Sequence, residues 1–311
     1  MLFPSGFSVH SLRGQDNALQ LAVMVFNILS ALGFFFLAAI LLTALLSSRV
    51  RRVSTWYGYI LAWMAFCIPP SLVIGHQTHL DSPPSFQSCV VDSALMYASR
   101  PFAGFATLSL VLQMYLNVST RLKHGEVGKK WLFGLIALPP AMYLFMFLWT
   151  LAVGINNPSQ VELEPTGFYC HLNNPVPAIV GAALVVFTTS LALIVEGLTV
   201  LLLYRNWRAF RILQRRDEHA VSLSLIIRVS VFAILPIAGL ALSFTTYVPN
   251  LPAAFFPAYN ILLASFPAAA AIIFGSQMDI LGVWMFWRRS YEMDSEGKLD
   301  LRHSTTNSSS A

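Results

Sequence analysis

The chain has 311 residues and a formal net charge of +5, and 56% of its residues are hydrophobic while only 11% are charged. Soluble domains carry about 25% charged residues, so this chain has too few charges to cover a water-soluble fold of its size. Disordered chains are poor in apolar residues, which excludes disorder as well. The composition and the mean hydropathy of +0.65 therefore predict a membrane protein.

Seven stretches are apolar over the ~20 residues that a helix needs to cross a bilayer. None has the short alternating strands of an outer-membrane barrel. We therefore predict an all-α integral membrane protein, a seven-transmembrane helix bundle over residues 19–275 that follows a short outer N-terminus, 1–18. The predicted spans are Leu19–Leu46, Thr55–Gly75, Cys89–Ser119, Trp131–Ile155, Pro177–Tyr204, Val221–Tyr247 and Pro257–Gly275.

The segment after the seventh span predicts a short amphipathic cytoplasmic helix over residues 276–289. Ile280, Trp284 and Trp287 fall near one face of such a helix, and tryptophan favours the membrane–water interface. An ordinary juxtamembrane stop signal is the alternative. Residues 290–311 are polar and end in serine and threonine, so we expect a disordered cytoplasmic tail.

The basic residues predict the orientation. Sixteen of the nineteen lysines and arginines lie in the segments after spans one, three, five and seven. The opposite side holds only Arg13, while Arg100 and Arg228 lie within spans. Because short basic loops stay in the cytoplasm, we predict a plasma-membrane protein with an extracellular N-terminus and a cytoplasmic C-terminus. We expect no cleaved signal peptide and, since no continuous basic face is present, no nucleic-acid partner.

Two of the three cysteines fall on the predicted outer side. Cys89 opens the third span, and Cys170 lies in the loop before the fifth. That compartment is oxidising, so we predict a disulfide that ties the second outer loop across the top of span three. The alternative is three unrelated free cysteines, with Cys67 a packed thiol. The proline and asparagine content of the outer loops predicts irregular, turn-rich segments.

Charged residues within spans are costly and usually face the bundle interior. Asp92 and Arg100 are eight residues apart in span three and therefore lie near one face. Arg100 either anchors an acidic group of a ligand or belongs to an interhelical polar network. Glu196 and Arg228 lie roughly 12–14 Å from the inner ends of spans five and six. We expect them to pair, either as static support or as a switch.

Seven spans, an outer N-terminus and one such cysteine pair together resemble G-protein-coupled receptors. The run Ile273-Phe274-Gly275-Ser276-Gln277-Met278-Asp279 is similar to the end of span seven in fungal seven-helix receptors and cAMP-receptor-like proteins. Gln113-Met114-Tyr115 stands where the rhodopsin-like family has Asp-Arg-Tyr, so only the tyrosine matches. The span-six and span-seven motifs of that family are also incomplete, since only their prolines, Pro236 and Pro267, are present.

The resemblance implies a receptor that binds a small molecule or short peptide on the outer half of spans three, five, six and seven. A heterotrimeric G protein would bind at the inner face. The basic segment Arg205–Arg216 would contact that protein and anionic membrane lipids. The candidate ligand-binding residues are Asp92, Met96, Arg100, Tyr169, Tyr247 and Tyr259, and the candidate switch residues are Glu196, Arg228, Gln113 and Tyr115.

The alternative function is a small-solute transporter or channel, with Asp92, Arg100 and Glu196 lining a polar path. An enzyme is disfavoured because no histidine lies within a predicted span to bind a metal or act as a base. Retinal binding is excluded because span seven has no lysine. We expect no cofactor and no metal.

Overall fold

The computed structural model describes residues 16–47, 52–77, 84–122, 125, 127–164, 166–208 and 255–285. Five of the helices in these ranges are long and apolar enough to cross a membrane. The structure is consistent with the predicted all-α, multi-pass membrane protein, and it shows five of the seven predicted spans as long apolar helices. The predicted sixth span and the predicted tail lie outside the described residues. The five long helices are α1 (Asp16–Leu46), α4 (Phe86–Leu122), α5 (Lys129–Asn156), α6 (Pro175–Arg205) and α9 (Phe255–Gly275).

The predicted second span is not one continuous helix. The structure divides it into α2 (Ser54–Phe66) and α3 (Pro69–Leu72), with a turn at Cys67 and Ile68. Two consecutive prolines open α3. They lack the N–H groups that would bond the carbonyls one turn earlier, so the helix breaks in front of them.

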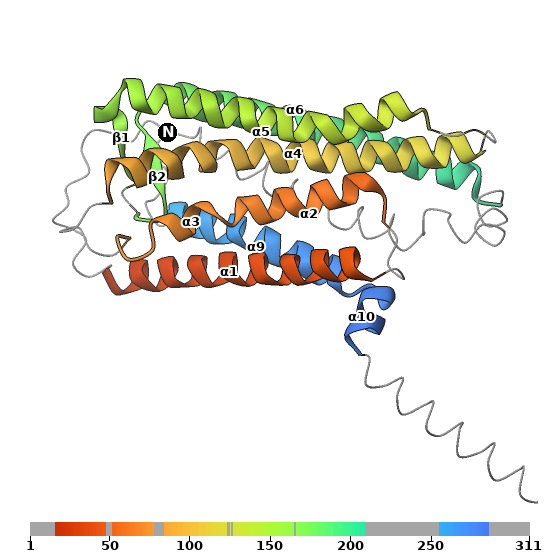
Figure 1. Cartoon of the computed structure of the whole chain (residues 1–311), viewed down its shortest axis with the longest axis horizontal. Coiled ribbons are helices and arrows are strands. Elements are labelled where there is room, and N and C mark those ends of the chain that lie inside the picture. Colours follow the sequence, from red (N-terminus) through yellow and green to blue (C-terminus); the bar gives the residue numbers. More distant parts are fainter. Residues whose placement is uncertain are drawn as a thin grey trace, which may run out of the picture.

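Helix α4 lies at the centre of one half of the bundle. It contacts α2, α5 and α6, whereas α1 packs along α9 (Figure 1). The largest cluster of buried apolar side chains joins α1, α2, α4, α6 and α9, and Trp56, Leu110 and Phe274 lie in it with no exposed surface. Large apolar side chains such as Phe35 and Phe133 point outward from α1 and α5. These outward faces suit a lipid environment.

The loop between α5 and α6 contains a small β-hairpin rather than the irregular segment that its composition predicts. A 3₁₀ turn (Pro158–Gln160) leads into β1 (Val161–Leu163), which pairs antiparallel with β2 (Cys170–Leu172). Gly167 in the connecting turn has a φ of +76°, and a Cβ there would lie 2.4 Å from the carbonyl oxygen of Gln77. The turn therefore requires glycine for its backbone conformation and for the close approach.

The short helix predicted after span seven is present as α10 (Met278–Trp284), at the end of the bundle opposite the hairpin (Figure 1). Arg52 donates hydrogen bonds to the side chains of Gln277 and Asp279. The indole Nε1 of Trp284 donates to Thr43 Oγ1 on α1 at 2.8 Å. These bonds fasten α10 to α1 and to the residues just before α2. The rest of the predicted helix, 286–289, lies outside the described residues.

A glycine sets the close approach of α1 to α9. A Cβ at Gly33 would lie 2.8 Å from the Cβ of Pro267 and 3.2 Å from the backbone nitrogen of Ala268. Helix association within membranes depends on close packing between small residues. We therefore expect one added methyl group at Gly33 to push α1 and α9 apart.

The variant Gly33→Ala should destabilise the protein by about 1–3 kcal/mol, because the methyl group meets α9 backbone that cannot move aside. Gly197→Ala on α6 is the matched control, since no atom of another described element lies within 4 Å of the added Cβ. The control should leave the melting temperature of the purified protein unchanged or slightly raised. Equal melting temperatures for the two variants would contradict the close packing of α1 on α9.

Candidate functional site

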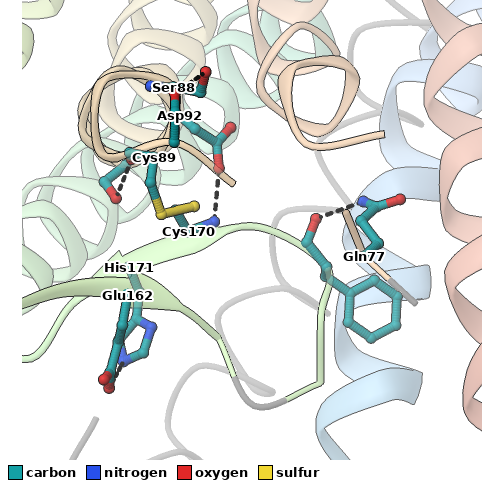
Figure 2. The surroundings of a disulfide bond; sticks show 10 residues. Gln77, Ser88, Cys89, Asp92, Glu162, Cys170 and His171 are labelled. Carbon is teal, nitrogen blue, oxygen red and sulfur yellow. Dashed lines mark hydrogen bonds and ion pairs between the residues drawn. A yellow bond between two sulfur atoms is a disulfide. The ribbon is translucent and has the colours of Figure 1, made fainter. Parts of the chain in front are cut away.

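The predicted disulfide between Cys89 and Cys170 is present, and it joins the start of α4 to β2 (Figure 2). One turn further along α4, Asp92 Oδ2 accepts a hydrogen bond of 2.6 Å from the backbone N–H of Cys170. The Asp92 side chain has no exposed surface. A covalent bond and a short hydrogen bond therefore hold the same residue of the hairpin against α4.

A second set of contacts holds the tip of the hairpin. Gln77 Nε2 donates to the carbonyl oxygen of Phe168 at 3.0 Å, and Asn27 Nδ2 on α1 donates to Gln77 Oε1 at 2.5 Å (Figure 2 shows Gln77). The ring of Phe168 is fully buried and meets Phe26 of α1 edge-on, with 4.9 Å between ring centroids. These contacts of Phe168 also hold the next residue, Tyr169, against the helix bundle.

Tyr169 covers the side chain of Arg100. The guanidinium carbon lies 5.7 Å from the centroid of the Tyr169 ring, and Arg100 Nη2 donates a long hydrogen bond of 3.5 Å to the phenol oxygen. This geometry is that of a cation–π contact. Within the described part of the chain, Arg100 Nε has no hydrogen-bond partner and no carboxylate lies within 4.0 Å of the guanidinium.

Glu164 is the carboxylate whose charge acts on Arg100. It follows β1, its backbone N–H bonds the carbonyl of Tyr169 at 3.0 Å, and its side chain is 3% exposed. Burial raises the pKa of Glu164, while hydrogen bonds from Thr166 and the positive charge of Arg100 oppose the rise. The hairpin thus carries both an aromatic ring and an acidic group to the arginine.

A cavity of about 130 Å³ opens beside Arg100, between α2, α4, α6 and α9. Among the described residues, its polar lining comes from Arg100, two tyrosines and two threonines, and the other described lining residues are small or apolar. One wall is aromatic, with Trp63 and Phe66 from α2. The polar lining residues are Tyr97, Arg100, Thr107, Thr189 and Tyr259.

The structure separates the predicted ligand-binding residues into three groups. Arg100 and Tyr259 line the cavity, and Tyr169 of the hairpin contacts Arg100. Met96 is buried in the cluster around Phe168, and Asp92 is bonded to the hairpin, so neither lines the cavity. The remaining candidate, at position 247, lies outside the described residues.

The sequence analysis missed four polar residues of this site, namely Tyr97, Thr107, Thr189 and Glu164. Tyr97 lies three residues before Arg100 and therefore on the same helix face, a spacing that could have identified it. Thr107 is one further lining residue on α4. Glu164 lies in the predicted loop between spans four and five, and nothing in its local sequence indicates the turn that holds it in the hairpin.

The candidate switch residues lie further along the helices, away from the hairpin. Gln113 on α4 is buried, and its Oε1 accepts hydrogen bonds from Thr55 Oγ1 at 2.5 Å and from Thr55 N at 3.3 Å. Gln113 thus satisfies a backbone donor in the first turn of α2, which the helix itself cannot. Tyr115 packs against the main apolar cluster. Glu196 is half-buried on α6, and Arg228 lies outside the described residues, so their pairing stays a prediction.

The site combines hydrogen-bond donors with an apolar cavity. The guanidinium and the phenol hydroxyls provide hydrogen-bond donors at one end of an apolar cavity. Among the residues that the structure describes, no group of three or more His, Cys, Asp or Glu side chains could hold a metal ion. No protein-family model matches the chain, and no curated protein matches it by sequence.

Replacing Asp92 should separate its structural role from a role in binding. Asp92→Ala leaves the buried N–H of Cys170 without an acceptor and should lower the free energy of unfolding by about 1–3 kcal/mol. Asp92→Asn keeps an acceptor oxygen and should recover a large part of the loss. Thermal unfolding of the oxidised protein measures both. The assignment would be wrong if the alanine variant were as stable as the wild type.

Proposed function

We propose that this chain is a seven-transmembrane receptor, similar to fungal-type G-protein-coupled receptors, that senses a small extracellular ligand and signals to a heterotrimeric G protein. The observation that carries the proposal is the cavity beside Arg100, which lies among the long helices near a disulfide-tied hairpin. Small-molecule sites are typically concave and apolar, with a few convergent polar groups, and this cavity has that composition.

The proposed topology has seven spans in the plasma membrane, with residues 221–247 as the sixth. The N-terminus and the hairpin are extracellular, and α10 is cytoplasmic. The distribution of the basic residues supports this orientation. Sixteen of the nineteen lysines and arginines lie in the segments after spans one, three, five and seven, which are the segments proposed to be cytoplasmic. A disulfide at the hairpin suits the oxidising extracellular side.

At the inner half, we propose that Glu196 and Arg228 pair in the resting state and that activation breaks the pair. Gln113 and Tyr115 supply polar contacts near the inner end of α4. If the pair is direct, the double swap Glu196→Arg with Arg228→Glu should restore much of the basal signalling that either single change alters. A swap that restores neither signalling nor stability would show that the two side chains do not meet.

The receptor function predicts ligand-dependent nucleotide exchange on a co-expressed G protein. Arg100→Gln should abolish or strongly weaken the response to a ligand extract, whereas Arg121→Gln, at the other end of α4, should retain ligand sensing at equal surface expression. The measurement is guanine-nucleotide exchange in membranes. A small-solute transporter or channel is the second candidate, because the same cavity contains a charged side chain. Solute flux in proteoliposomes with no nucleotide exchange would favour it over the receptor.

A further inference from the structure

Arg100 carries a positive charge that the surrounding protein compensates only in part. Its side chain is partly exposed, and the cavity is the space that it borders. Its Nε has no hydrogen-bond partner among the described residues, and its Nη2 donates only a long hydrogen bond of 3.5 Å to the hydroxyl of Tyr169 there. A charge in such an apolar setting is costly unless it is paired and hydrogen-bonded.

Among the described residues, no carboxylate forms a direct ion pair with Arg100. Tyr169 contacts the guanidinium through its ring and its hydroxyl, and Tyr97 and Tyr259 line the same cavity. No carboxylate of the described residues comes within 4.0 Å of the guanidinium. An anion in the cavity would supply the missing partner, because arginine pairs with a carboxylate through two parallel hydrogen bonds.

The rest of the cavity suits an apolar body of limited size. Trp63 and Phe66 form its wall on α2, and Phe266 contributes a further ring from α9. The α6 side carries small residues, among them Ala182. The volume is about 130 Å³, and a cavity of about 150 Å³ in another protein holds one benzene molecule. The cavity therefore has room for about one ring.

We propose that the cavity binds a small organic monoanion built on a single apolar ring, of the aromatic carboxylate class. The carboxylate pairs with Arg100 beneath Tyr169, and the ring packs against the aromatic residues of α2 and α9. This inference rests on the proposed function for the role of the cavity as the ligand site. It adds the charge and the size of the ligand.

The test uses the purified full chain in lipid nanodiscs and three probes of one shape: phenylacetate, its neutral amide phenylacetamide, and the cation phenethylamine. Phenylacetate should bind saturably in calorimetry and raise the melting temperature with concentration. The amide and the amine should bind at least tenfold more weakly. Arg100→Gln should weaken phenylacetate binding by roughly 10- to 100-fold, the loss expected for a hydrogen-bonded charge pair.

A matched pair of variants locates the binding. Ala182→Phe places a ring in the cavity and should abolish phenylacetate binding, whereas Ala183→Phe, at the exposed neighbouring position, should leave it unchanged. If Arg100→Gln does not fold, this pair decides the question. The proposal is overturned if the wild type binds the three probes equally, if it binds none of them, or if Ala182→Phe binds phenylacetate as the wild type does.

The outcomes also separate this inference from the proposed function. Phenylacetate binding without any nucleotide exchange would support the anion site and contradict the receptor. Nucleotide exchange driven only by neutral or cationic compounds, with no binding of phenylacetate, would support the receptor and contradict the anion site.

Discussion

The need to accommodate a guanidinium inside an apolar helix bundle shapes the end of this protein that carries the hairpin. Arginine at the centre of a membrane helix costs about 2.5–3.5 kcal/mol even by insertion scales that allow the bilayer to adapt. Arg100 lies on α4, which contacts α2, α5 and α6, so it cannot be moved to the lipid surface without disturbing the helix at the core of the packing. Compensation has to come from neighbouring side chains.

The hairpin provides that compensation. Tyr169 packs its ring on the guanidinium, and Glu164 is an acidic group of the same hairpin. Both residues belong to the turn between β1 and β2. A two-stranded hairpin has little stability by itself in water. The disulfide and the Asp92 hydrogen bond hold β2 on α4, and Gln77 holds the turn. Contacts from distant parts of the chain thus hold the turn that carries Tyr169 and Glu164 at the end of the bundle where Arg100 lies.

The spans could be predicted well where a single property decides the structure. The requirement for ~20 apolar residues placed the boundaries of α4 within three residues at each end, and the same holds for α1, α5, α6 and α9. The second span was predicted as one helix because its hydropathy continues across Pro69 and Pro70, although the missing N–H groups of these prolines break the helix. Composition alone does not resolve such local interruptions.

The site could be predicted only in part, for a related reason. Arg100 was recognisable because a charge within an apolar stretch has few explanations. Asp92 was recognisable on the same ground, but its partner is a backbone N–H of Cys170, 78 positions away, and backbone donors leave no signature in a sequence. The hairpin escaped prediction because strands of three residues are too short to show alternation. Glu164 was therefore placed in a loop, without a connection to Arg100.

The central claim is that the disulfide-held hairpin positions Tyr169 on Arg100. A double-mutant cycle that combines Arg100→Gln with Tyr169→Leu, read as free energies of unfolding, tests it most directly. We predict a coupling energy of about 0.5–2 kcal/mol in the oxidised protein, the range of a cation–π contact. The coupling should disappear when Cys89 and Cys170 are both replaced by serine. No coupling with the disulfide intact, or an equal coupling without it, would contradict the account.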